Sequence, residues 1–299
     1  MSAEPAGLET TTFTVAVDGG ELQVICFGAG PTPVLGIHGI TANSMSLRPV
    51  ARRLGAEHTL LAPDLRGRGG SAALPGPYGM RAHAADCAAV IRASTSGPVV
   101  VLGESMGAYV AVVLAAEHPA VVQRLVLADG GLPLPLPPGL PPGTEPAAVI
   151  DMLLGPAIAR LGLIFESHAS YLDFWRRHPA FERDWSDDIQ AYFEYDLAPC
   201  PGGFRSRVSE AAVRVDAVQH LAEPQVIGEA LTRIACPITL VRAPRNLLDQ
   251  PVPLLGDAVV DEWQGRLPHL STEMVEDVNH YTLMMGWRGA GLLAARVAG

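Results

Sequence analysis

One short stretch of the sequence, in which an apolar run leads directly into a serine flanked by glycines, constrains the fold more than any other. Val99–Leu102 is apolar and mostly β-branched, which is typical of a short buried strand. The pentapeptide Gly-Glu-Ser-Met-Gly at 103–107 follows at once, and Ala108–His118 is rich in Ala, Val and Leu, which predicts a helix. A strand, a tight turn and a helix in this order predict a nucleophile elbow with Ser105 at its tip.

The two glycines of this turn, Gly103 and Gly107, fit the elbow because its backbone is strained and leaves no room there for side chains. Such a turn exposes the serine Oγ beside a helix N-terminus, where backbone N–H groups can bind an oxyanion. The alternative is a glycine-rich strand-to-helix turn in a sheet protein without catalytic activity. The strand before Ser105 and the helix after it favour the catalytic interpretation.

Size and charge narrow the possible functions. With 299 residues, 48% of them hydrophobic, the chain is long enough for one α/β domain, with or without an insertion. It carries 31 acidic against 21 basic residues, all of them arginine, for a net charge of −10. Without lysine there is no Walker-type phosphate loop, Schiff-base catalysis or Ser–Lys dyad. A net negative charge without a cluster of basic residues argues against nucleic acid or an anionic membrane as a partner.

The cysteines and the chain start predict an ordinary intracellular environment. Cys26, Cys87, Cys200 and Cys236 are far apart and form no C-x-x-C pair, so we expect reduced thiols, no metal site and no cofactor. Residues 1–12 are polar, unlike a signal peptide, and no apolar run approaches the length of a membrane span. We therefore expect a soluble, cytoplasmic protein that acts on a small molecule. The sequence leaves its oligomeric state open.

The order of predicted elements indicates a sheet domain with an insertion. Up to Gly131, strands alternate with helices, which implies a mostly parallel sheet covered on both faces. Six prolines then occur between Pro133 and Pro142, and no convincing strand appears before Ile238–Val241. We predict a core domain formed by residues 1–132 and 234–299, with a helical cap at 133–233.

Four motifs in this sequence match those of the α/β-hydrolase superfamily, in the superfamily's order. They are His38-Gly39, the loop Asp64-Leu65-Arg66-Gly67-Arg68-Gly69, the elbow at 103–107, and Asn279-His280. The chain resembles the superfamily over nearly its whole length. This resemblance implies an α/β-hydrolase fold with an eight-stranded, mostly parallel sheet and a cap after strand six. The motif at 64–69 is usually structural in the superfamily, and we interpret it so.

A serine needs a base to take its proton, and His280 is the best candidate. It is the histidine that follows a late predicted strand in a short loop before a helix. His38 is the rival by position, but a histidine beside the oxyanion loop more often serves structure. The resemblance implies an oxyanion hole formed by the backbone N–H groups of Met106 and Ile40. Glu104 either biases the site electrostatically or is buried beneath the loop in a hydrogen bond, and the second is favoured.

The third member of the triad has two candidates. The superfamily usually places the acid after strand seven, but here Asn246 occupies that position, and the nearest carboxylate is Asp249. The other location known in the superfamily, directly after strand six, holds Asp129. We favour Asp129 as the catalytic acid and keep Asp249 as the alternative. The alternative interpretations are structural: Asp129 is then a turn residue, and Asp249 is a solvated carboxylate in a loop.

The predicted cap suggests the kind of substrate. It holds ten of the seventeen aromatic residues and 14 acidic residues against 8 arginines. We expect several aromatic side chains to line the cleft, with a bulky, uncharged, partly aromatic ester or lactone as substrate. A strand-six acid with an aromatic-rich cap is similar to the zearalenone-type lactonases, which implies a macrolactone.

The first functional hypothesis is therefore a serine carboxylic-ester hydrolase or lactonase with the triad Ser105, His280 and Asp129. A second keeps the triad for other chemistry, as in a C–C bond hydrolase, an acyltransferase or a proline iminopeptidase. A third is a small-molecule receptor built on a hydrolase scaffold. The fold alone does not select among them.

Overall fold

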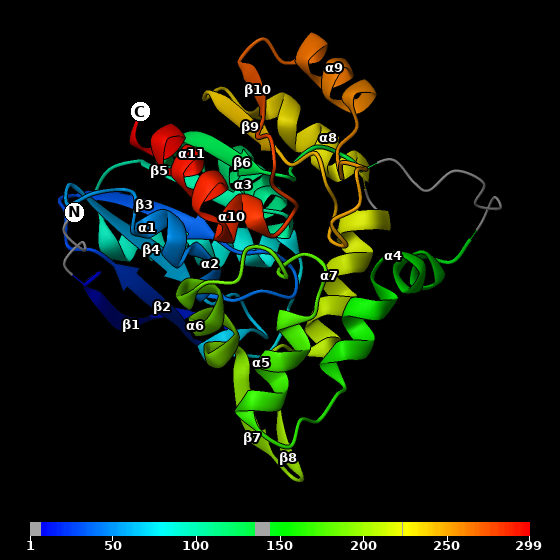
Figure 1. Cartoon of the computed structure of the whole chain (residues 1–299). Helices are drawn as coiled ribbons and strands as arrows, with labels where there is room; N and C mark the ends of the chain where they lie inside the picture. The colour runs from blue at the N-terminus through cyan, green and yellow to red at the C-terminus, as the bar shows by residue number, and fades with distance from the viewer. Residues whose placement is uncertain (1–6, 135–143, 223) are drawn as a thin grey trace, which may run out of the picture.

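The computed structural model describes residues 7–134, 144–222 and 224–299. The expectations for the first six residues and for the prolines at 135–142 lie outside these ranges. One large sheet runs through the molecule in the order β1-β2-β4-β3-β5-β6-β9-β10 (Figure 1). Its strands are β1 Thr10–Val17, β2 Gly20–Phe27, β3 Thr32–Ile37, β4 His58–Pro63, β5 Val99–Glu104, β6 Val122–Ala128, β9 Ile238–Arg242 and β10 Leu270–Met274.

The sheet is mostly parallel, as predicted. β2 pairs antiparallel with β1 and with β4, and every other neighbouring pair is parallel. The carboxyl ends of β3, β5, β6, β9 and β10 therefore meet along one edge. In open α/β sheets, ligand sites form in the crevice outside this edge.

Helices cover both faces of the sheet (Figure 1). One face carries α2 (Met80–Ser94), α3 (Met106–Glu117), α8 (Pro224–Arg233) and α9 (Asp257–Arg266), and the other α1 (Arg48–Ala51), α10 (Thr282–Met285) and α11 (Trp287–Ala298). Successive side chains of a strand point to opposite faces. Accordingly Val101 belongs to the apolar cluster around α3, whereas Val100 and Leu102 belong to the cluster around α11. Both faces of β5 are thus buried.

Most of the described residues between β6 and β9 form a lobe beside the sheet (Figure 1). We call α4 (Pro146–Leu161), α5 (His168–Arg176), α6 (Asp187–Asp196), α7 (Glu210–Ala222) and the strands between α6 and α7 the cap. Those strands, β7 (Leu197–Cys200) and β8 (Gly203–Ser206), form a hairpin where the sequence predicts only helices. Gly202 and Gly203 supply the turn, with φ of 89° and 146°.

Helix α8 lies within the segment predicted as cap but packs on the sheet side. Ile227, Ala230 and Leu231 are buried in the same apolar cluster as α3. The lobe visible in Figure 1 is therefore built from α4–α7 and the hairpin.

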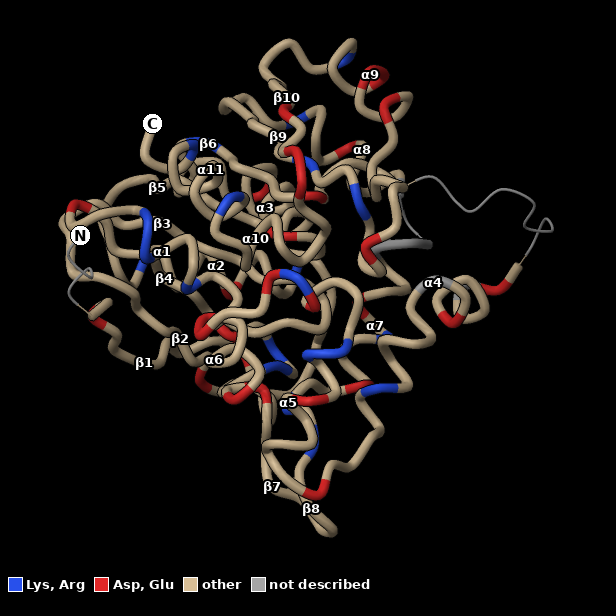
Figure 2. Tube along the Cα trace, viewed as in Figure 1, with Lys and Arg blue, Asp and Glu red and all other residues tan. Residues whose placement is uncertain are grey.

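Charges are distributed over both parts of the molecule. Acidic and basic segments are interspersed along the trace, with several acidic ones around α6 (Figure 2). Within the described residues, no helix combines the length and the apolar character needed to cross a bilayer.

Candidate active site

Ser105 occupies a sharp turn between β5 and α3. Its backbone has φ of 51° and ψ of −119°, a conformation that non-glycine residues rarely adopt. The turn is held because the Ser105 N–H donates a hydrogen bond of 2.9 Å to the Ala128 carbonyl of β6. A Cβ at Gly103 would lie 2.4 Å from the Gly107 oxygen, and one at Gly107 would lie 2.1 Å from the Ile37 oxygen. Close backbone approach therefore requires both glycines.

His280 lies in the loop between β10 and α10, with its backbone N–H bonded to the Arg245 carbonyl at 2.9 Å. Its ring is buried, and its Nδ1 lies 2.6 Å from Oδ2 of Asp129. Asp129 directly follows β6 and is fully buried. Its N–H donates to Val241 at 2.8 Å, and its Oδ1 accepts a hydrogen bond of 3.3 Å from the Ala243 N–H. Strands β6 and β9 thus hold this carboxylate rigidly against the imidazole.

The surroundings of His280 favour its protonated form. Burial lowers the pKa of His280, but the hydrogen bond and charge of Asp129, together with the charge of Glu104, outweigh that effect and raise it above the ordinary 6.5. A base with a raised pKa accepts the serine proton more readily, at the cost of being protonated at mildly acidic pH.

Asp249 is engaged elsewhere. Its carboxylate accepts hydrogen bonds from Arg245 at 2.6 Å, Arg183 at 2.8 Å and the Asn279 side chain at 3.0 Å. Burial raises the pKa of Asp249, but these three donors outweigh it and lower the pKa below 3.8. Of the two candidate acids, the structure brings Asp129 to His280, whereas Asp249 supports the adjoining residue Asn279.

A small cavity adjoins these residues. It is lined in part by Ser105, His280, Glu104, Gly39 and Ile40, and its volume is about 30 Å³. This is room for about two water molecules. Ile40 lies in the loop after β3, which pairs with β5, and it lines the same cavity as Ser105. Met106 is the first residue of α3, where backbone N–H groups have no partner within the helix.

Glu104 is buried beneath the oxyanion loop, as the sequence interpretation favoured, with a hydrogen bond from the Gly39 backbone. Its Oε2 has no hydrogen-bond partner among the described residues, and its Oε1 lies 3.8 Å from Nε2 of His280. Burial raises the pKa of this carboxyl, while the charge of His280 and the Gly39 backbone lower it by less. Its position inside the pentapeptide was visible in the sequence, but its direction toward the cavity was not.

The aromatic side chains of the cap mostly do not line the cavity, contrary to the sequence expectation. Of the ten, Tyr192 of α6 is the one on its wall. Most of the others pack on one another between α5 and α6, as in the stacking of Trp175 on Phe193 with ring centroids 4.3 Å apart. The remaining wall is formed by residues that include Leu247, Tyr281, Met284 and Met285, and its described lining contains no arginine. These aromatic residues belong to the same apolar cluster as α1, α10 and α11, so they join α5 and α6 to one face of the sheet domain.

His38 has a structural position. Its Nδ1 is 2.8 Å from the Gly39 carbonyl, and its Nε2 accepts a hydrogen bond of 3.0 Å from the Leu65 N–H. Burial lowers the pKa of His38 to about 3, so the ring is neutral and both nitrogens are engaged. No three His, Cys, Asp or Glu side chains of the described ranges are placed to hold a metal ion.

Comparisons with known proteins agree with this fold. A family model described as an alpha/beta hydrolase fold matches residues 32–154. The chain is 29% identical to 2-(acetamidomethylene)succinate hydrolase of Mesorhizobium japonicum over 254 residues, 85% of this chain and 83% of the relative. A crystal structure of E-2-(acetamidomethylene)succinate hydrolase superposes with a TM-score of 0.74 at 26% identity, over 93% of this chain and 94% of that one.

The thioesterase domain from the curacin biosynthetic pathway is similar in fold, with a TM-score of 0.76 at 20% identity, over 98% of this chain and 100% of that one. The resemblance inferred from four short motifs is thereby confirmed. The chain has the α/β-hydrolase fold, and residues 32–154 match the model of that family.

Proposed function

We propose that the protein is a serine hydrolase that cleaves an uncharged carboxylic ester or lactone, with Ser105 as nucleophile, His280 as base and Asp129 as the orienting acid. The observation that carries the proposal is the buried contact of 2.6 Å between Asp129 and Nδ1 of His280, beside a serine on a strained elbow. A carboxylate at Nδ1 holds the tautomer in which Nε2 is free to accept a proton.

The reaction follows from these positions. The Ser105 oxygen attacks the substrate carbonyl while Nε2 of His280 takes its proton. The oxyanion accepts hydrogen bonds from the backbone N–H groups of Ile40 and Met106. Collapse of the tetrahedral intermediate breaks the bond to the leaving oxygen, which receives the proton from His280. Water then attacks the acyl-enzyme by the same proton route and releases the acid.

The charge around the cavity supports an uncharged substrate. The described lining contains no arginine, the chain contains no lysine, and the carboxyl of Glu104 faces the cavity. The related hydrolase is named for a succinate, which carries two carboxylates. A dianion would meet no countercharge here and would be repelled by ionised Glu104.

The size of the cavity bears on the expected bulk of the substrate. A space of about 30 Å³ admits little more than water, so a substrate with a large acyl group requires that wall residues such as Tyr192 and Met284 move aside. We therefore expect small acyl groups to react without this movement and bulky lactones to depend on it.

The second candidate is hydrolysis of an amide by the same triad. It is favoured by the relative named for an acetamidomethylene group, which is similar over most of the chain. A more basic leaving nitrogen requires stronger protonation by His280 but no different residue.

Labelling and a substrate panel test the proposal together. A fluorophosphonate probe should label Ser105 in the wild-type protein and fail to label Ser105→Ala. The panel should contain p-nitrophenyl esters of increasing acyl length, neutral lactones, neutral amides and matched carboxylate-bearing analogues. We expect the wild-type protein to turn over neutral esters or lactones. The kcat of Ser105→Ala should be lower by several orders of magnitude.

Other outcomes would redirect the assignment. Full activity in Ser105→Ala would refute the serine mechanism. Preference for the carboxylate-bearing analogues would refute the substrate class, and preference for amides would select the second candidate. Saturable binding of a panel member with negligible turnover would indicate a receptor.

A further inference from the structure

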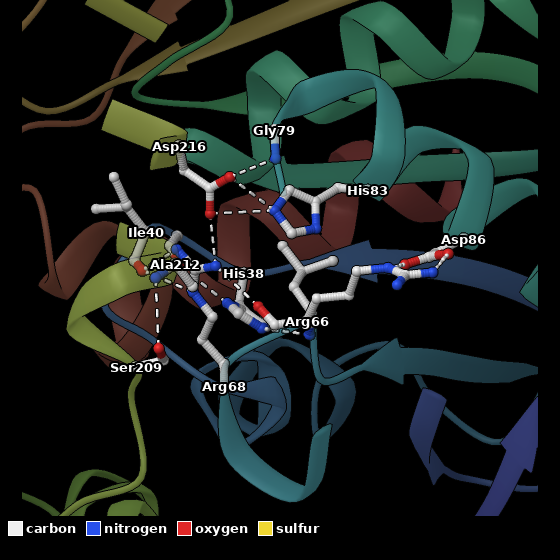
Figure 3. Close-up of polar contacts among 12 residues, drawn as sticks. His38, Ile40, Arg66, Arg68, Gly79, His83, Asp86, Ser209, Ala212 and Asp216 are labelled. Atoms are coloured by element: carbon white, nitrogen blue, oxygen red, sulfur yellow. Dashed lines mark hydrogen bonds and ion pairs between the residues drawn. The ribbon is translucent and has the colours of Figure 1, made fainter. Parts of the chain in front are cut away.

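A buried arginine in the loop after β4 contacts the same residue that supplies the proposed oxyanion donor. Arg68 is fully buried, and its Nε and Nη2 donate hydrogen bonds of 3.0 and 2.9 Å to the Ile40 carbonyl. Its Nη1 donates to the Arg66 carbonyl at 2.9 Å. Figure 3 shows this guanidinium beside Ile40. The forked donors thus fix the orientation of the peptide that follows Ile40.

The same guanidinium is paired with the cap. Its Nη1 lies 2.5 Å from Oδ2 of Asp216 on α7, and both side chains are fully buried. Asp216 also accepts a hydrogen bond of 2.6 Å from the Gly79 N–H and lies 3.1 Å from Nε2 of His83 (Figure 3). A buried pair is stable only when its remaining donors and acceptors are satisfied, and here the hydrogen bonds to Ile40, Arg66 and Gly79 contribute to that.

The side chain of Ile40 provides a second link to the cap. It packs against the apolar cluster of the cap, which contains Ile158 of α4 and Val213 and Ala217 of α7. Ile40 therefore touches the cap directly through its side chain and indirectly through its carbonyl, Arg68 and Asp216. A shift of α7 relative to the sheet would move both supports of this residue.

We propose that Arg68 is a positioning residue, which holds Ile40 in the geometry of an oxyanion donor and, through Asp216, makes that geometry depend on the docking of the cap. The proposal rests on the proposed function, in which the Ile40 N–H binds the oxyanion. This positioning role requires an arginine. A lysine at this place can neutralise Asp216, but it lacks the planar guanidinium that donates two hydrogen bonds to the Ile40 carbonyl.

A second buried pair nearby provides a matched control. Arg66, two residues before Arg68, pairs with Asp86 through Nε at 2.5 Å and Nη2 at 2.9 Å, with both side chains nearly fully buried. None of the contacts found for this pair involves Ile40. Loss of either pair should destabilise the protein, but only loss of the Arg68 pair should alter the oxyanion loop.

The experiment compares Arg68→Lys, Asp216→Asn and Asp86→Asn at a temperature at which thermal unfolding shows each to be folded. With a short-chain p-nitrophenyl ester, we expect Arg68→Lys to lose about 10²-fold in kcat with little change in KM. The rate of fluorophosphonate labelling should fall with kcat. Asp216→Asn should lose on the order of tenfold, because Arg68 keeps its backbone contacts but loses its counter-ion. Asp86→Asn should keep the wild-type kcat despite a lower Tm.

The proposal is overturned if folded Arg68→Lys has the wild-type kcat, or if Asp86→Asn loses as much kcat as the Arg68 variant. If Arg68→Lys does not fold, the kcat of Asp216→Asn tests the proposal by itself. An unchanged kcat in Asp216→Asn then overturns the proposed coupling to the cap. These results are distinguishable from failure of the proposed function, which Ser105→Ala reports separately.

Discussion

Replacing Asp129 by asparagine tests the candidate triad at its most constrained point. The two oxygens of Asp129 have different partners, because Oδ2 contacts Nδ1 of His280 at 2.6 Å and Oδ1 accepts from the Ala243 N–H at 3.3 Å. The side-chain amide of an asparagine cannot satisfy both of these partners. If its oxygen faces His280, its NH₂ opposes the Ala243 N–H as donor against donor. If its NH₂ faces His280, Nδ1 must become the acceptor, and Nε2 then carries the proton and cannot act as a base.

The expected magnitude follows from this tautomer argument. Conversion of a triad acid to its amide lowers kcat by about 10³- to 10⁴-fold, which corresponds to ~4–5.5 kcal/mol of transition-state stabilisation. The backbone should not confound the result, since Asp129 has φ of 50° and asparagine tolerates this region as well as aspartate. The assay is kcat and KM for an ester substrate, with thermal unfolding to show that the variant is folded.

Asp249→Asn is the matched control. Asp249 also has a positive φ, of 60°, and its contacts with Arg245 and Arg183 lie nearer the surface. We expect the control to lose less than about tenfold in kcat and about 1 kcal/mol or less in stability. The reasoning is refuted if folded Asp129→Asn stays within tenfold of the wild type while Asp249→Asn loses three orders of magnitude.

The remaining predictions concern pH, metals and the elbow. In the proposed mechanism neutral His280 is the active form, and its pKa is raised, so kcat/KM should increase with pH through a midpoint above 6.5. Glu104→Gln should move that midpoint down, and an upward shift would contradict the electrostatic argument. A chelator should leave activity unchanged, and loss with EDTA that zinc restores would reveal a metal site. Gly107→Ala should lower Tm and abolish activity, because its Cβ would lie 2.1 Å from the Ile37 oxygen, whereas Gly97→Ala, with no atom within 4 Å, should do neither. Equal Tm in the two glycine variants would contradict this account of the elbow.

Local patterns in the sequence were sufficient to predict the sheet and the elbow. The apolar run before Gly103 and the helix-forming residues after Gly107 define a strand and a helix within a window of about twenty residues. The hairpin in the cap was missed, because Leu197–Cys200 and Gly203–Ser206 are each four residues long and too short to show a periodicity. Only the turn residues Gly202 and Gly203 offered a signal.

The sequence by itself determined which residue types stand at the ends of the strands: a serine after β5, an aspartate after β6 and a histidine after β10. Tertiary structure alone decided which aspartate meets the histidine, since Asp129 and His280 are 151 positions apart and the strand order brings them together. It also decided that most of the cap aromatics pack into the cluster on one face of the sheet, away from the cavity, and that Arg68 joins Ile40 to α7. These outcomes depend on packing between distant segments, and no local periodicity encodes such contacts.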